Sequence, residues 1–174
     1  MRIFRGFVAA AALLWTIPTL AADGRDAKAA GAGCATGMVC AADPATVAAA
    51  LMEAGYRAKP GKMDNGAPMI SSAAAGYNYD VFFSGCTDNK ACKSLTFSVT
   101  FTDDDQVNSA ELANEWNAGY RFSTMAFNKD KTLSVTYDVT TVGGINKANF
   151  ADVIEWWSII LGDLRVFFNT RNKP

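Results

Sequence analysis

Four cysteines are the side chains of this 174-residue chain that are best suited to chemistry, and they form two pairs of identical spacing. Five residues separate Cys34 from Cys40, and five separate Cys86 from Cys92. Zinc ligands are usually closer, about two to four residues apart, and thioredoxin-type redox pairs have about two intervening residues. The spacing therefore predicts two structural disulfides. Four cysteines allow three pairings, of which the local one is the simplest.

No other residues form a catalytic or metal-binding pattern. The chain has no histidine, which is the commonest general base and a frequent metal ligand. The acidic run Asp103 to Asp105 resembles the start of a calcium-binding loop, but such a loop has glycine at its sixth position and glutamate at its twelfth. This chain has Asn108 and Asn114 there. We therefore expect no catalytic residue, no metal site and no cofactor, and we predict that the protein is not an enzyme.

The charge of the chain argues against a nucleic-acid partner. Its 16 basic and 17 acidic residues give a net charge of −1, and Lys and Arg are scattered singly among acids and amides. Proteins that bind nucleic acids normally carry a basic stripe. We expect no nucleic-acid binding.

The amino-terminal end has the layout of a cleavable export signal. Arg2 and Arg5 precede an apolar run from about Phe7 to Leu20, and the small residues Ala21 and Ala22 follow. The run is too short to span a bilayer. We predict a signal peptide over 1–22, a flexible leader over 23–37 and a single domain over 38–174. The mature protein should be periplasmic or secreted, with no membrane contact after signal cleavage, in an oxidising compartment that permits disulfides.

The rest of the chain predicts a mixed α+β domain. Strict alternation of apolar and polar residues, as in Leu95 to Thr102, is typical of an antiparallel sheet with one face buried and one in water. We therefore expect a two-layer fold with the helices packed on one face of the sheet. The predicted strands are Tyr56 to Lys59, Pro68 to Ala73, Tyr77 to Ser84, Leu95 to Thr102, Tyr120 to Phe127 and Leu133 to Thr140.

Three helices should cover the sheet. The first begins after Asp43, with Pro44 at its first position and Val47, Leu51 and Ala54 on its apolar face. The second begins at Asn108, with Glu111 completing a capping box. The third begins near Asn146 and carries most of the core at helical spacing. Its predicted buried residues are Phe150, Val153, Ile154, Trp157, Ile160, Leu161, Leu164, Phe167 and Phe168.

Three apolar residues of the last helix, Trp156, Ile159 and Val166, lie off its buried stripe. Either a loop or the first helix covers them, or they form a contact surface for a second copy or another partner. We take the second alternative as our hypothesis. A competing hypothesis is that the polar face of the sheet binds a small molecule or carries a minor enzymatic activity, with Asp80, Asp138 and Arg121 as its polar groups.

Several segments resemble the YbjN family, described as bacterial sensory transduction regulators. They are GYRAKPGKMDNGAPMISSAAAG, YDVFFSGC, NEWNAGYRF and GGINKANFADVIEWW, within about 38–168. The resemblance implies no catalytic residues. It also implies a fold similar to type III secretion chaperones, an antiparallel sheet flanked by helices that commonly dimerises and holds partner segments. This chain differs from those cytosolic chaperones in its export signal and cysteines.

Together these observations predict an exported, non-catalytic binding or regulatory domain of YbjN type. It should act through a protein or peptide partner or as a homodimer.

Overall fold

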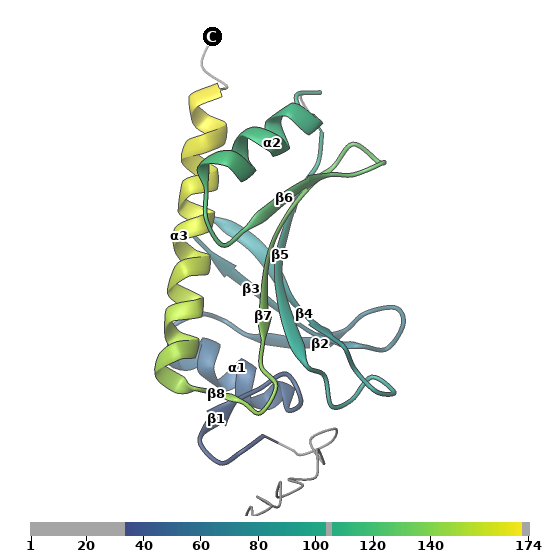
Figure 1. The fold of residues 1–174 in the computed structure, drawn as a ribbon, viewed down its shortest axis with the longest axis vertical. Helices are drawn as coiled ribbons and strands as arrows, with labels where there is room; N and C mark the ends of the chain where they lie inside the picture. Colours follow the sequence, from purple (N-terminus) through teal and green to yellow (C-terminus); the bar gives the residue numbers. More distant parts are fainter. Residues whose placement is uncertain (1–33, 104–105, 172–174) are drawn as a thin grey trace, which may run out of the picture.

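The computed structural model of the chain describes residues 34–103 and 106–171. The predicted signal peptide, residues 23–33 of the predicted leader, Asp104 and Asp105 lie outside these ranges. Figure 1 shows one sheet with a long helix standing along it and a shorter helix near each end. The helices are α1 (Pro44–Glu53), α2 (Ala110–Gly119) and α3 (Lys147–Arg171). The strands are β1 (Met38–Val39), β2 (Lys59–Lys62), β3 (Pro68–Ala74), β4 (Tyr77–Ser84), β5 (Ser94–Phe101), β6 (Thr124–Phe127), β7 (Leu133–Thr140) and β8 (Ile145–Asn146).

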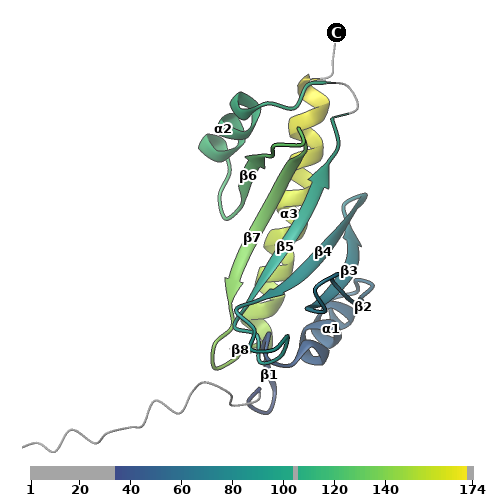
Figure 2. The same cartoon turned by 90° about the vertical axis from the view of Figure 1, so that its right-hand side faces the viewer.

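The main sheet has six strands in the order β2-β3-β4-β5-β7-β6, and all its neighbours are antiparallel. Buried and more accessible residues alternate along the strands, as in Leu95, Phe97 and Val99 against Thr96, Ser98 and Thr100. In Figure 2 the strands β4, β5 and β7 lie in front of α3, so the view is onto the side of the sheet that faces away from this helix. The more accessible residues lie on this side. We call this the open face and the opposite side the covered face. The predicted antiparallel α+β fold is confirmed.

The core lies between the covered face and α3. Phe97 of β5 is at its centre, with its ring centroid 5.8 Å from that of Trp157 and 6.5 Å from that of Phe150. The side chain of Asn146 caps the start of α3 by accepting a hydrogen bond from the Asn149 N–H at 2.8 Å. The helix therefore begins where the sequence predicts. Seven of its nine predicted core residues are buried, and Val153 and Phe168 are partly buried.

Helix α1 begins as predicted. The Asp43 carboxylate accepts a hydrogen bond from the Ala45 N–H at 3.2 Å, and Gly55 follows the helix with a left-handed φ of 86°. Two expectations about this region are wrong. Ala54 is exposed, because the helix ends before it. The strand begins at Lys59 rather than Tyr56, since the chain must first leave the helix and reach the sheet edge.

The start of α2 also differs from the prediction. Ser109, not Asn108, is the capping residue, and its hydroxyl accepts a hydrogen bond from the Leu112 N–H. The side-chain amide of Asn108 instead donates hydrogen bonds to the carbonyls of Phe101 and Lys131. These two bonds join the end of β5 to the β6–β7 turn. Two neighbouring residues could each have capped this helix, and these tertiary contacts decide between them.

The cysteines pair locally, Cys34 with Cys40 and Cys86 with Cys92. Their Cα atoms are 5.8 Å and 3.8 Å apart, respectively. The first pair lies beside β1, which forms a two-stranded antiparallel sheet with β8 that the sequence did not predict. The second pair closes the loop between β4 and β5. No helix among the described residues is both long and apolar enough to cross a membrane.

Both edges of the main sheet resist pairing with another strand. At the β6 edge, the Asn117 side chain of α2 accepts from the Met125 N–H at 2.8 Å and donates to the Met125 carbonyl at 3.0 Å. Asn117 thus occupies the backbone groups that a further strand would use. At the other edge, β2 contains Pro60, which has no N–H to offer, between two exposed lysines, Lys59 and Lys62.

We predict that Asn117→Ala lowers the free energy of unfolding by about 1–2 kcal/mol, because it removes two partly buried hydrogen bonds. It should also promote concentration-dependent association, since the Met125 edge becomes free. Urea unfolding and light scattering measure the two effects. Asn114→Ala, an exposed asparagine of the same helix, is the control and should change neither. An Asn117 variant as stable and as soluble as the wild type would contradict this role.

Candidate functional site

The outward side of α3 is the apolar surface that the sheet leaves free. The buried stripe of the helix faces the sheet, and Ile159 and Val166 lie on the other side of its axis. Their side chains are 43% and 57% exposed. Val166 comes seven positions after Ile159, which is about two helical turns, so both side chains point in nearly the same direction. No described loop or helix covers either residue. We call these two residues the α3 strip.

Trp156 is not part of this strip. It is only partly exposed, and its ring packs edge-on against Phe122, with centroids 4.7 Å apart. Phe122 is 47% exposed, and it also approaches Tyr137 of β7 at 6.2 Å. The Arg121 guanidinium lies 4.7 Å from the centre of the Phe122 ring. The three predicted surface residues therefore divide into the α3 strip and an aromatic corner beside α2.

Phe122 is a surface residue that the sequence did not predict. It was assigned to the interior of a strand from Tyr120 to Phe127, but β6 begins at Thr124. Phe122 itself has a left-handed φ of 64°, which an apolar side chain rarely adopts. This backbone bend turns the ring out of the strand direction and onto Trp156. Gly119, three residues before Phe122, was the only local sign that the chain turns here.

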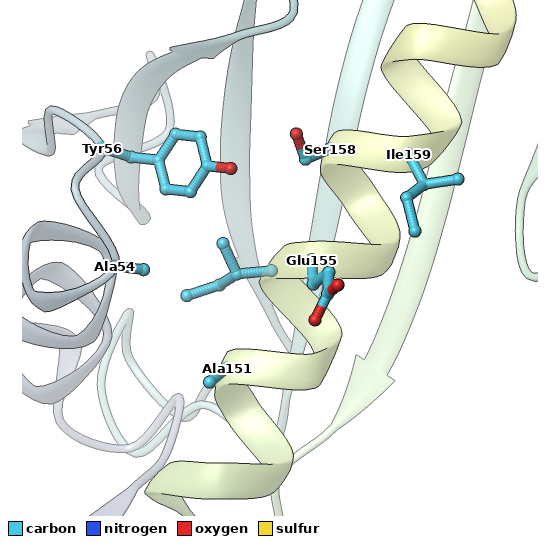
Figure 3. Close-up of a pocket in the computed structure, with 7 residues that line it drawn as sticks. Ala54, Tyr56, Ala151, Glu155, Ser158 and Ile159 are labelled. Carbon is cyan, nitrogen blue, oxygen red and sulfur yellow. The ribbon is translucent and has the colours of Figure 1, made fainter.

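A groove runs between the end of α1 and the outward side of α3 (Figure 3). Its volume is about 220 Å³. In the figure the Tyr56 ring reaches from the α1 side toward the helix, with its hydroxyl pointing toward Ser158. Ile159 contributes to both the groove and the α3 strip. The lining residues are Ala54, Tyr56, Ala151, Ile154, Glu155, Ser158 and Ile159.

The charges along α3 are unevenly paired. Lys147 of α3 forms an ion pair with Glu53 at the end of α1, at 2.8 Å, and Arg171 pairs with Glu115 of α2. Among the described residues, the carboxylates of Asp152, Glu155 and Asp163 on α3 form no ion pair. The outward side of the helix therefore combines exposed apolar residues with unneutralised negative charge.

Beneath α3, three buried polar atoms have no hydrogen-bond partner in the part of the chain that the structure describes: Ser72 Oγ, the Tyr79 hydroxyl and Trp157 Nε1. Burial raises the pKa of Tyr79 above its usual value, because ionisation would leave a charge in an apolar core. The nearby Ser72 hydroxyl lowers the pKa, although the two groups do not reach hydrogen-bond geometry, and the phenol of Tyr56 raises it.

The competing small-molecule site is not assembled. Asp80 and Asp138 do lie on the open face, where each accepts a hydrogen bond from a hydroxyl of the neighbouring strand, Ser71 and Thr96 respectively. Arg121 is elsewhere, because it stacks on Phe122, which packs against Tyr137 and Trp156 on the covered side. The three residues of that hypothesis therefore do not face a common ligand.

Comparison with known proteins identifies one family. The family model named YbjN, described as "putative bacterial sensory transduction regulator", matches residues 43–166. This range covers more than half of the chain and includes both walls of the groove. No curated protein matches the sequence.

The raised pKa of Tyr79 predicts how stability changes in alkali. An unfolded tyrosine loses its proton near pH 10.0, whereas folded Tyr79 holds it to higher pH. Folding stability is thus full below pH 10.0 and decreases as the pH rises past that value, because only the unfolded chain gains by ionising. Tyr79→Phe should lose less unfolding free energy than the wild type between about pH 8 and about pH 11.

Urea unfolding at these two pH values, with the disulfides intact, measures this difference. At the lower pH the variant should be at least as stable as the wild type, since the removed hydroxyl has no hydrogen-bond partner. Equal losses in the two proteins would show that Tyr79 is not the buried group responsible.

Proposed function

Because the chain belongs to the YbjN family, we propose that it is an exported, non-catalytic regulatory domain that acts by binding a protein or peptide. The observation that carries this proposal is the α3 strip. Ile159 and Val166 are exposed apolar residues on the longest helix, and burying them against a partner would be favourable. The exposed ring of Phe122 in the aromatic corner extends the apolar surface on one flank.

The absence of histidine from the sequence supports a binding role rather than catalysis. The two aspartates of the open face already accept hydrogen bonds from hydroxyl groups of the neighbouring strands. A regulator of this kind needs only a difference in binding between two states of its partner.

Export is supported by two independent features. Arg2, Arg5 and the apolar run after them have the arrangement of a signal peptide. The two cysteine pairs are compatible with an oxidising compartment, in which disulfides persist. We therefore propose a periplasmic or secreted protein with a signal peptide over 1–22 and a leader up to residue 37.

The protected edges of the sheet favour one kind of contact. Partners often add a strand to an exposed sheet edge, but Asn117 occupies one edge here and Pro60 interrupts the other. A partner is therefore expected to contact side chains of α3 rather than the backbone of the sheet.

Site-specific photocrosslinking in cells tests this function. We predict that p-benzoylphenylalanine at position 159 or 166 gives a polypeptide adduct in the periplasmic fraction. The same probe at Thr100, which is exposed on the open face, is the control and should give none. Adducts from Thr100 alone would favour the open face instead. Recovery of an untrimmed protein from the cytosol would contradict export.

A further inference from the structure

The groove beside α3 has the size of one amino-acid side chain. Small-molecule sites usually have volumes of about 300–1,000 Å³, and this groove has about 220 Å³. Its apolar surface comes from Ala54, Ala151, Ile154 and Ile159. A single leucine or aromatic side chain presented by a polypeptide would bury its apolar surface there, which is favourable.

The polar rim of the groove indicates what should flank this side chain. Glu155 lines the groove and has no ion pair among the described residues. Lys147, a cation of the same helix, is held by Glu53. The free carboxylate is complemented by a lysine or arginine of the ligand. The hydroxyls of Tyr56 and Ser158 can bond to a peptide backbone at the same rim.

Helix α3 also leaves space for a chain to lie along it. Gly162 lies between Ile159 and Val166, and a Cβ atom added there would meet no atom within 4 Å. Glycine in the middle of a helix is less favourable than alanine, and no contact within the described residues requires it. Its small size lets another backbone approach the α3 strip closely.

A second copy of the chain fits this surface poorly. Glu155 and Asp163 lie four residues before and after Ile159, on neighbouring turns of the helix. Antiparallel packing of two α3 helices about Ile159 would place Glu155 of each copy near Asp163 of the other. Neither carboxylate forms an ion pair within the described residues, so the contact would bring two unpaired negative charges together and be repulsive.

From these contacts we infer that the groove between α1 and α3 binds a peptide segment of a partner protein, through a large apolar side chain next to a lysine or arginine. The inference rests on the proposed binding function and names the chemistry of the partner. The apolar side chain fills the groove, the basic residue pairs with Glu155, and the following chain passes over Gly162 toward Val166.

Selection from a random peptide display library, with the oxidised mature protein as bait, tests this inference. The wild type should enrich peptides in which a large apolar residue is next to Lys or Arg. Against a selected peptide, Glu155→Lys should lower the affinity about tenfold or more, the effect of about 1.4 kcal/mol. Selection on that variant should instead enrich acidic residues. Glu111→Lys, which makes the same charge change on exposed α2, should bind as the wild type does.

A second variant tests the groove itself. Ser158→Trp should fill the groove and abolish peptide binding, while circular dichroism shows a folded protein. The inference would be overturned if the selected peptides lacked the basic and apolar pair. It would also be overturned if they bound Glu155→Lys or a folded Ser158→Trp as well as they bind the wild type. A crosslink from position 159 only to a second copy would do the same. If crosslinks to another protein persist while the selection fails, only the groove chemistry is wrong; if both fail, the binding function is wrong too.

Discussion

The structure depends on the burial of one stripe of α3 against one face of the sheet. Phe97, in the middle of β5, has its ring within 6.5 Å of those of Phe150 and Trp157, so the central strand and the helix share a single aromatic core. An α-helix buries only part of its circumference on a sheet. The same contact that holds the fold together therefore leaves two surfaces in water, the open face of the sheet and the outward side of α3.

These two surfaces differ in what they offer a partner. The open face is lined with hydroxyls whose neighbouring aspartates, Asp80 and Asp138, already accept hydrogen bonds from Ser71 and Thr96. The outward side of α3 has exposed apolar residues, unpaired carboxylates and an adjacent groove. Because Asn117 and Pro60 also protect the sheet edges, the backbone groups of the sheet are not offered to a partner. The side chains of α3 are the groups that a partner can contact.

The sequence predicted those features whose pattern repeats. The strands around Phe97 and Val135 and the stripe of α3 were predicted correctly, because periods of about two and 3.6 residues persist over many residues there. The two-residue strands β1 and β8 are too short to have a period. The cap at Ser109 and the bend at Phe122 depend on distant contacts. A helical projection placed Trp156 with the α3 strip because it does not include the neighbouring loop. The groove was missed since one wall is the segment after α1 and the other is α3, which is far away in the sequence.

We propose that Ile159 and Val166 serve a contact outside the fold and not the fold itself. The most direct measurement is the free energy of unfolding, in urea, of a variant that combines Ile159→Asp and Val166→Asp. Exposed positions of this kind usually tolerate substitution within about 0.5 kcal/mol each. We predict a folded protein whose stability falls by about 1 kcal/mol at most. A loss of several kcal/mol would show that the two side chains support the domain, and it would contradict the account.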